Sequence, residues 1–327
     1  MIKNKVMVTG GAGFIGSKLV KRLLEENKKV YVYDLIPLEK ASRLNDIKDN
    51  KNFFYTEGDL RDKEKIDDWY VKDATHLFHL ASVVGVNLYI DNPLALIDIV
   101  VGGTRSLLEL ATLYKTRVIF TSTSEVYGKN PDIPWSEDDD RVLGPTSIDR
   151  WSYSSSKAVC EHMLFSLGRS NDLPFTIIRF FNVYGPGQAP IFVVSKSIYQ
   201  VLNNESPFLY DSGKQTRCFT YVDDAIDGVL KASESEKALG QIFNIGSNVE
   251  TSMDQVIKLI IDASGKNLQI KEFFTDNEYG DRYEDIPRRI PDVSKSKKIL
   301  NWEITTSLDD GIKKIFKWSQ ENPWWSK

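Results

Sequence analysis

Short apolar runs alternate with amphipathic helical patterns along residues 1–180 of the chain. The apolar run Val6–Val8 is followed at once by apolar positions at helical spacing, from Phe14 to Leu24. Such alternation predicts a parallel sheet whose crossover helices cover both faces, which is a doubly wound α/β fold. Further strands of this sheet are expected at residues 29–33, 52–57, 75–80, 117–121 and 175–179.

The strict alternation ends beyond Pro190, where helical patterns mix with shorter apolar runs. We interpret residues 1–185 as the sheet domain and residues 186–327 as a smaller α/β lobe, with some chain crossing between the two. The lobe is expected to close over the carboxyl edge of the sheet. Its expected elements are strands at 208–210, 217–222, 241–245 and 268–273 and helices at 191–202, 224–232, 252–263, 294–300 and 308–318.

Three other segments receive a purely structural interpretation. One long helix is predicted from Pro93, because apolar positions recur at helical spacing as far as Leu110. The acidic run Glu137–Asp140 is expected to form a solvated surface turn. The pair Trp324 and Trp325 is expected to pack its rings on the protein surface.

A glycine-rich turn connects the first strand to the first helix. Gly10, Gly13 and Gly16 have the spacing G-x-x-G-x-x-G between a strand and a helix, the context that a dinucleotide-binding turn requires. Each glycine removes a side chain where the backbone must turn tightly, approach a pyrophosphate or pack the helix on the sheet. The helix opens with Phe14 and Ile15 and points free N–H groups at an anion. We therefore predict a Rossmann-type cofactor site that includes all five residues.

An acidic residue follows the second strand at the distance that this site needs. Asp34 lies roughly twenty residues past the glycines, where a carboxylate accepts hydrogen bonds from both adenosine ribose hydroxyls and repels a 2′-phosphate. No arginine follows directly, and the nearest is Arg43. The expected cofactor is therefore NAD rather than NADP. The alternative is an ordinary strand–turn–helix unit in which Asp34 is only a cap.

Two further strand ends extend the predicted cofactor site. Asp59 and Leu60 follow the third strand, where an adenine ring would rest, although Asp59 is equally compatible with a plain turn. The fourth strand ends at Leu80. The small residues Ala81 and Ser82 that follow would let a cofactor lie close to the backbone.

The candidate catalytic residues lie on the fifth strand and on the helix after it. Tyr153 and Lys157 are four residues apart and therefore share one helix face. A neighbouring ammonium and a positive nicotinamide are expected to lower the pKa of the tyrosine from about 10 toward neutrality, so that it acts as a base. Thr123, Ser124 and Glu125 follow the fifth strand, at the sheet edge where open α/β folds bind ligands. Thr123 is expected to donate a hydrogen bond to the substrate oxygen.

Composition narrows the class of protein. The 327 residues carry a net charge of −4, which gives no electrostatic reason to expect nucleic acid or an anionic membrane as a partner. Two cysteines and three histidines without a CxxC pair predict neither a disulfide framework nor a metal site. The N-terminus enters a strand directly and no apolar run approaches the length of a membrane span. A soluble, cytoplasmic protein is expected.

Taken together, the motifs resemble the extended short-chain dehydrogenase/reductase family, in its nucleotide-sugar branch of epimerases, 4,6-dehydratases and uronate decarboxylases. The resemblance covers essentially the whole chain and implies a tightly bound NAD that is reduced and reoxidised within one turnover. The segments that carry it are TGGAGFIG, HLAS, TSTSEVYG, YSSSK, RFFNVYGPGQ, TRCFTYVDDA and RRIPDVSKSKKILNWE.

The resemblance also implies a UDP-sugar, or another nucleotide sugar, as substrate. Asn182 matches the asparagine of the family that contacts the diphosphate and sugar, and Arg217 and Arg289 match its two phosphate-binding arginines. Tyr210 corresponds to a position that stacks on the nucleobase. Enzymes of this family usually form homodimers through two long helices, here expected at residues 94–114 and 153–167.

The branches of the family differ at the residues that follow the fifth strand. Dehydratases resemble T-D-E, whereas Ser124 stands at the place of the aspartate, and a serine hydroxyl is too weak an acid for that role. The combination T-S-E is similar to UDP-glucuronate decarboxylases, in which a 4-ketone makes a 5-carboxylate labile. Glu125 would then manage the proton at C5, position a water that does so, or merely orient the loop.

The predicted function is therefore decarboxylation of a UDP-uronate to a UDP-pentose. The alternatives are a 4-epimerase or 4,6-dehydratase of the same family and, more remotely, a non-catalytic dinucleotide-binding sensor. One departure concerns the segment after Gln188, which is shorter than in uronate decarboxylases and lacks their basic residue. The sugar is therefore expected to be glucuronate, an N-acetylated uronate or another hexose.

Overall fold

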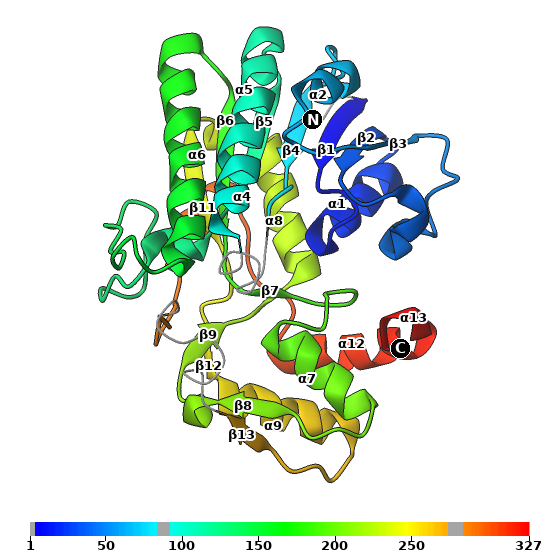
Figure 1. Cartoon of the computed structure of the whole chain (residues 1–327), viewed down its shortest axis with the longest axis vertical. Coiled ribbons are helices and arrows are strands. Elements are labelled where there is room, and N and C mark those ends of the chain that lie inside the picture. Colours follow the sequence, from blue (N-terminus) through cyan, green and yellow to red (C-terminus); the bar gives the residue numbers. More distant parts are fainter. Residues whose placement is uncertain (1–3, 84–91, 274–283, 327) are drawn as a thin grey trace.

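The computed structural model describes residues 4–83, 92–273 and 284–326 (Figure 1). A seven-stranded sheet forms the centre, in the order β11-β6-β5-β4-β1-β2-β3. Each neighbouring pair of strands is parallel. The seven strands are β1 (Lys5–Thr9), β2 (Lys29–Asp34), β3 (Phe53–Glu57), β4 (His76–His79), β5 (Arg117–Thr123), β6 (Phe175–Phe180) and β11 (Gln241–Ile245). The predicted doubly wound α/β fold is confirmed.

Helices cover both faces of this sheet because its strands alternate their side chains between two apolar layers. Val6 and Val8 of β1 face one layer, whereas Met7 faces the other. Helices α1 (Phe14–Glu25), α8 (Val222–Glu234) and α11 (Ser294–Leu300) pack on the first face. The opposite face carries α2 (Lys63–Trp69), α4 (Pro93–Ile97), α5 (Gly103–Tyr114) and α6 (Arg150–Asn171).

A smaller lobe with its own apolar core lies below the sheet in Figure 1. Its helices are α7 (Val193–Leu202), α9 (Met253–Ser264), α12 (Leu308–Glu321) and α13 (Pro323–Ser326). Its short strands are β7 (Val183–Tyr184), β8 (Phe208–Tyr210), β9 (Thr216–Cys218), β10 (Thr220–Tyr221), β12 (Glu250–Ser252) and β13 (Lys271–Phe273).

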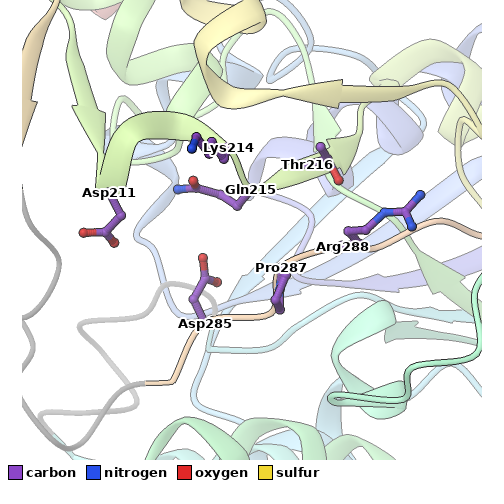
Figure 2. A pocket seen from close by; sticks show the side chains of 7 residues that line it. All are labelled: Asp211, Lys214, Gln215, Thr216, Asp285, Pro287 and Arg288. Atoms are coloured by element: carbon purple, nitrogen blue, oxygen red, sulfur yellow. The ribbon is translucent and has the colours of Figure 1, made fainter.

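The smaller lobe contains an open pocket of about 440 Å³. It lies where the loop after β8 faces the segment that begins at Glu284, and Figure 2 shows the side chains around it. The residues that line it are Asp211, Lys214, Gln215, Thr216, Asp285, Pro287 and Arg288.

Three elements expected in the smaller lobe belong to the sheet domain, and one expected helix is interrupted. The strand expected at 241–245 is β11, which pairs with β6 and forms an edge of the main sheet, and helices α8 and α11 pack on that sheet. The helix from Pro93 is interrupted by a π-helical turn at Asp98–Gly102 between α4 and α5. Gly103 begins α5 in close contact with Leu60, since a Cβ at this glycine would lie 2.6 Å from the Leu60 Cβ. The pattern of apolar residues does not reveal such a local change in helix type.

Two surface assignments hold only in part. Asp138 and Asp140 of the acidic run are exposed, as expected. Glu137 is buried, because its carboxylate accepts the backbone N–H of Asn244 at 2.8 Å and its carbonyl accepts from Arg179. Trp325 is also buried, and its indole N–H donates to the Gln188 carbonyl at 2.6 Å. Trp324 is exposed, as expected.

Candidate active site

The glycine turn leaves no room for side chains at two of its positions. Gly10 has a φ of +75°, and a Cβ there would lie 2.7 Å from the backbone nitrogen of Ala81. A Cβ at Gly16 would lie 2.0 Å from the Gly10 carbonyl oxygen. Gly13 precedes α1 with extended backbone and no side-chain cap, so the first N–H groups of the helix face outward from the turn. The turn thus has the close backbone approach and free donors that fit a pyrophosphate.

Asp34 lies at the end of β2 directly beside this turn. Its two carboxylate oxygens accept the backbone N–H of Ala12 at 2.8 Å and of Ile36 at 3.0 Å. Burial raises the pKa of this carboxyl group, and these hydrogen bonds oppose the shift. A carboxylate has about four acceptor positions, so two acceptors stay available for ribose hydroxyls. The positive charge of Arg43 lies near Asp34, and the Arg43 Nε donates to the Gly187 carbonyl at 2.7 Å.

The two residues expected near an adenine ring have different surroundings. The Asp59 side chain is held by Arg61, with a shortest contact of 2.6 Å, and its carbonyl accepts the hydroxyl of Tyr33 at 2.9 Å. Leu60 is buried in the apolar layer and contacts the start of α5 at Gly103. Leu60 therefore contributes to the core as well as to this sheet edge.

The hydroxyl of Tyr153 lies at the carboxyl edge of the sheet, between the ends of β4 and β5. It lies close to the side chains of Ser82 and Thr123, residues that are distant in sequence from the α6 helix. Burial raises the pKa of Tyr153, the negative charge of Glu125 raises it further, and the neighbouring Ser82 and Thr123 side chains oppose the shift. The expected lowering of this pKa by Lys157 does not appear in the structure.

Lys157 makes a different contact from the one that the helix spacing suggests. Its ammonium donates to the Thr121 carbonyl at 2.9 Å and lies 4.7 Å from the centre of the Phe120 ring. Burial lowers the pKa of Lys157 to about 8. The side chain is therefore held against β5, one turn of α6 away from Tyr153.

The residues after β5 form a short 3₁₀ turn at Ser124–Tyr127. The Thr123 side chain caps this turn by accepting the backbone N–H of Glu125 at 3.2 Å. Ser124 is buried, and Ser154 of α6 donates to the Glu125 carbonyl at 2.7 Å. The turn is thereby attached to the helix that carries Tyr153.

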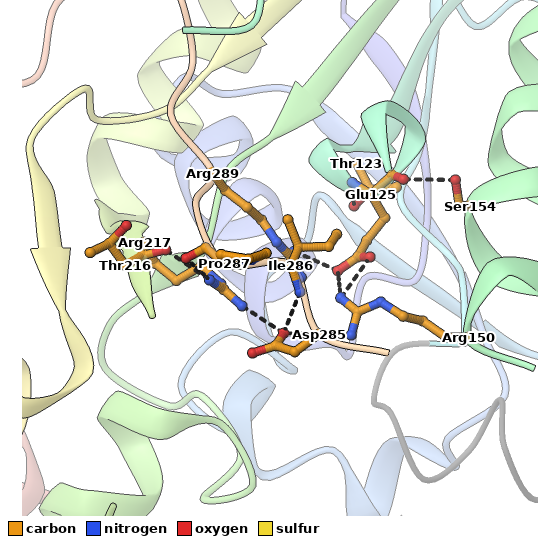
Figure 3. A network of polar contacts seen from close by, with 10 residues as sticks. All are labelled: Thr123, Glu125, Arg150, Ser154, Thr216, Arg217, Asp285, Ile286, Pro287 and Arg289. Carbon is orange, nitrogen blue, oxygen red and sulfur yellow. Dashed lines mark hydrogen bonds and ion pairs between the residues drawn. The ribbon is translucent and has the colours of Figure 1, made fainter. Parts of the chain in front are cut away.

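Glu125 lies within a cluster of arginine side chains (Figure 3). Arg150 donates one terminal nitrogen to both carboxylate oxygens, at 3.2 and 3.1 Å, and Arg289 contacts the first of these oxygens. Burial opposes ionisation of Glu125, but the charges of Arg150 and Arg289 outweigh it and lower its pKa to about 2. Glu125 is therefore a carboxylate, a hydrogen-bond acceptor rather than a proton donor.

A second carboxylate completes this cluster. Asp285 accepts from Arg217 at 2.9 Å and from its neighbour Ile286 at 2.8 Å, and it lies 3.8 Å from Arg150 (Figure 3). Burial raises the pKa of Asp285, while the surrounding arginines, Arg217 foremost, lower it overall. Three arginines and two carboxylates give the cluster a net positive charge, which suits a polyanionic ligand.

Two predicted substrate residues lie apart from this cluster. Asn182 follows β6 with a φ of +38°, and its carbonyl accepts the backbone N–H of Thr220 at 3.2 Å. Tyr210 ends β8, where the Lys196 ammonium lies 3.3 Å from its hydroxyl and Phe273 packs 6.2 Å from its ring centre. Asp211, the next residue, lines the pocket of the smaller lobe.

The structure thus brings Ser82, Thr123 and Tyr153 together and links Glu125 to Arg289. Sequence reasoning missed Arg150 and Asp285. Arg150 carried a usable signal, because it precedes Tyr153 by three residues and therefore shares its helix face. Asp285 carried none, since it lies in an irregular charged stretch.

Within the described part of the chain, no group of three or more histidine, cysteine, aspartate or glutamate residues could hold a metal ion. None of the helices described is both long and apolar enough to cross a membrane.

The family described as GDP-mannose 4,6 dehydratase matches residues 7–315 of the chain. The chain belongs to this family of extended short-chain dehydrogenases/reductases. This family member is 36% identical over 323 residues to a protein of Bacillus cytotoxicus named UDP-N-acetyl-alpha-D-glucosaminuronate decarboxylase. That alignment covers 98% of this chain and 99% of the relative.

Solved structures of family members have the same fold. A UDP-glucose 4-epimerase of Thermotoga maritima, solved with UDP-glucose, is 29% identical with a TM-score of 0.86, covering 98% of this chain and 99% of that one. A UDP-glucuronic acid 4-epimerase of Bacillus cereus was solved with UDP-glucuronic acid and NAD. It is 27% identical with a TM-score of 0.84, covering 97% and 99% of the two chains.

Proposed function

We propose that this protein is an NAD-dependent enzyme that decarboxylates a UDP-uronate to a UDP-pentose through a transient 4-keto sugar. The observation that carries the proposal is the arrangement of side chains at the sheet edge after β5. There the Tyr153 hydroxyl lies close to Thr123 and Ser82, beside an ionised Glu125. Position 124 carries a serine and not an acidic residue. The Bacillus cytotoxicus relative supports it by name and by full-length similarity.

The cofactor site fits NAD. The backbone of Gly10–Gly16 would hold the pyrophosphate, and Asp34 would bind the adenosine ribose. Ala81 and Ser82 would lie beside the nicotinamide half. The Asp34 carboxylate disfavours a 2′-phosphate, as expected for NAD over NADP. A bound NAD would supply a hydride acceptor for C4 of the sugar and, once reduced, the hydride donor that completes the turnover.

Tyr153 is the proposed base that removes the proton of the sugar 4-hydroxyl. Its phenol oxygen lies at the sheet edge, close to the side chains of Thr123 and Ser82. Since burial raises its pKa, ionisation must be favoured by positive charge close by when the site is loaded. Lys157 is a cation on that helix face, and its pKa of about 8 keeps it largely protonated at neutral pH.

A 4-ketone makes a carboxylate at C5 a β-keto acid, which loses carbon dioxide without an added acid. Carbon 5 then needs a proton. Glu125 is ionised between Arg150 and Arg289. We therefore propose that Glu125 orients a water molecule that protonates C5 and does not donate the proton itself. Ser124, which is buried and weakly acidic, has no part in expelling a 6-hydroxyl.

Epimerisation at C4 is the second candidate. The observation in its favour is that Glu125 is held in ion pairs with Arg150 and Arg289, so this side chain is not available to donate a proton to C5. The solved relative from Bacillus cereus is a UDP-glucuronic acid 4-epimerase with the same fold. Both reactions would share Tyr153 and the transient 4-ketone.

Product analysis separates the two. We expect purified protein with NAD and either UDP-glucuronate or UDP-N-acetylglucosaminuronate to release one carbon dioxide per UDP-pentose, detected by mass spectrometry. A UDP-uronate product of unchanged mass but inverted C4, identified by NMR, would replace decarboxylation by epimerisation. Matched incubations with UDP-glucose, which lacks a 5-carboxylate, are the control.

We also propose that the enzyme acts in the cytoplasm as a homodimer. Helices α4 and α5 follow one another along α6 in Figure 1, and both contact α6. They expose Leu94, Ile97, Leu113 and Val159, large apolar side chains with 39–68% of their surface accessible. Light scattering of the purified protein tests this, and a monomer at micromolar concentration would refute it.

A further inference from the structure

Arg150 occupies a place in the site that neither the glycine motif nor the Tyr-x-x-x-Lys motif accounts for. Its side chain is only 1% exposed, and it begins α6, the helix that carries Tyr153. Its terminal nitrogen donates to both oxygens of Glu125, and a second nitrogen lies 3.8 Å from Asp285. A buried guanidinium in this position has an electrostatic consequence for any anion that enters the site.

The two arginines on Glu125 differ in how they are attached. Arg289 belongs to the irregular segment after Glu284 and, as a proposed phosphate ligand, would turn toward a diphosphate. Arg150 is part of a regular helix and is fixed by the same turn that positions Tyr153. When a nucleotide sugar is bound, Arg150 would therefore be the partner that stays on Glu125.

A uronate brings its own negative charge to this place. If Glu125 acts at C5, the 5-carboxylate of the sugar lies close to the Glu125 carboxylate. Two charges of the same sign repel at this distance, and more strongly in a buried site than in water. Neutral hexoses would not experience this repulsion.

We infer that Arg150 neutralises Glu125 so that a sugar with a 5-carboxylate can bind, which makes it a specificity-determining residue for uronates over neutral sugars. The inference rests on the proposed function in that it places C5 beside Glu125. It assigns Arg150 a positioning and charge-balancing role and no contact with the reacting atoms.

The test compares binding of two ligands that differ at C5 alone. We would measure the Kd of UDP-glucuronate and of UDP-glucose by calorimetry, with NAD-loaded protein. Arg150→Gln should weaken UDP-glucuronate on the order of 10- to 100-fold and UDP-glucose far less, because only the uronate meets an uncompensated Glu125. Arg150→Lys, which keeps the charge, should largely retain the wild-type ratio.

A second substitution distinguishes charge balance from a structural role. Arg150→Gln combined with Glu125→Gln should restore the wild-type ratio, since neither charge is left. Glu125→Gln alone should favour UDP-glucuronate over UDP-glucose, because Arg150 then faces the uronate uncompensated. The Glu125→Gln variant keeps the test decisive if Arg150→Gln does not fold.

The matched control is Arg117→Gln. Arg117 is also a buried arginine, but it starts β5 at the opposite end of the strand and donates to the carbonyls of Ala232 and Ser235. Its loss should lower stability without changing the ratio of the two ligands.

Equal weakening of both ligands by Arg150→Gln, or no recovery in the double variant, would overturn the inference. Failure of the proposed function looks different. In that case the wild type binds UDP-glucuronate without releasing carbon dioxide, and the ligand ratios still decide the role of Arg150. A wild type that does not bind UDP-glucuronate at all overturns both.

Discussion

The guanidinium of Arg289 contacts the carboxylate of Glu125, although the two residues are 164 positions apart in the chain. This contact connects the smaller lobe to the turn after β5. A diphosphate bound by Arg289, as we propose, would compete with Glu125 for one terminal nitrogen of the guanidinium. The proposed role of Arg289 would therefore couple the charge of Glu125 to the affinity for nucleotide.

Glu125→Gln should consequently tighten the binding of UDP alone. Removal of the competing carboxylate releases Arg289 toward the diphosphate, and a threefold to tenfold lower Kd, or about 0.6 to 1.4 kcal/mol, is expected. Calorimetric titration with UDP measures it. Glu250→Gln is the control, because Glu250 pairs with the neighbouring Arg288 instead. Unchanged or weaker UDP binding would show that Arg289 is not a diphosphate ligand.

Tyr153→Phe should lower turnover by about 10²- to 10⁴-fold while NAD remains bound, because it removes a proton-transfer group and no part of the glycine turn. Product formation and NAD fluorescence quenching measure the two effects. Tyr70→Phe is a matched control, since this buried tyrosine donates to Thr116 on the other side of the fold. Full activity of the Tyr153 variant would end its assignment as the base.

Asp34→Ala should weaken NAD by at least 10- to 100-fold, because the loss of even one hydrogen bond to a charged group costs about 1.5–3 kcal/mol. The substitution also removes the acceptor of the Ala12 N–H and so loosens the glycine turn. Calorimetric titration with NAD provides the measurement. Asp46→Ala removes an exposed carboxylate that pairs with Lys21 on α1 and should leave the affinity unchanged. Equal NAD affinity in the Asp34 variant would remove it from the cofactor site.

Local sequence patterns are sufficient to predict some of these site residues but not others. The glycine turn and Asp34 follow from the order of one strand, one turn and the next strand, so a window of about thirty residues contains the information. The pairing of Arg289 with Glu125 joins residues 164 positions apart, which no such window contains. Arg150 is 25 positions from Glu125, but their contact depends on how α6 packs against the turn after β5. The same dependence on tertiary contacts applies to β11, which the chain order places in the smaller lobe although it pairs with β6.

The pKa of Tyr153 shows a different limit. Spacing on a helix correctly indicates that Tyr153 and Lys157 share a face, but it does not give the depth of burial or the partner of the ammonium. In the structure the Thr121 carbonyl takes that ammonium, and burial dominates the pKa of the phenol.

Acid should destabilise the protein through a buried histidine. His79 lies between the hydroxyls of Thr9 and Thr104, at 2.7 and 2.9 Å, and burial lowers its pKa from 6.5 to about 3. Below pH 6.5 the unfolded chain therefore binds a proton that the folded chain excludes. The contribution of the neutral His79 to the free energy of unfolding is fully present above pH 6.5 and is lost as the pH falls toward 3. In that range the free energy of unfolding should fall by about 1.4 kcal/mol per pH unit.

Urea unfolding at pH 7 and pH 5 measures this loss. His79→Gln keeps hydrogen-bonding capacity without a titrating ring, and it should make the free energy of unfolding less dependent on pH over that range. His162→Gln, which removes an exposed histidine from α6, leaves the Thr9–His79–Thr104 contacts intact and serves as the control. An unchanged pH dependence in the His79 variant would assign acid lability to other groups.

The C-terminal tryptophans should differ sharply in their effect on stability. Trp325 is 5% exposed, packs against Tyr199 and Trp318, and donates to the Gln188 carbonyl, whereas Trp324 is 41% exposed. Trp325→Ala should lower the free energy of unfolding by about 3–5 kcal/mol, as expected for loss of a large buried ring. Trp324→Ala, the matched control, should cost about 1 kcal/mol or less.

Differential scanning calorimetry compares the two tryptophan variants directly. The Gln188 loop is also held from the sheet domain, where Arg43 donates to the Gly187 carbonyl at 2.7 Å. Because Arg43 lies beside Asp34, loss of Trp325 should loosen one end of a connection that reaches the cofactor site. The Trp325 variant should therefore also bind NAD more weakly. Equal destabilisation by the Trp324 and Trp325 variants would mean that the tail packs only on the surface.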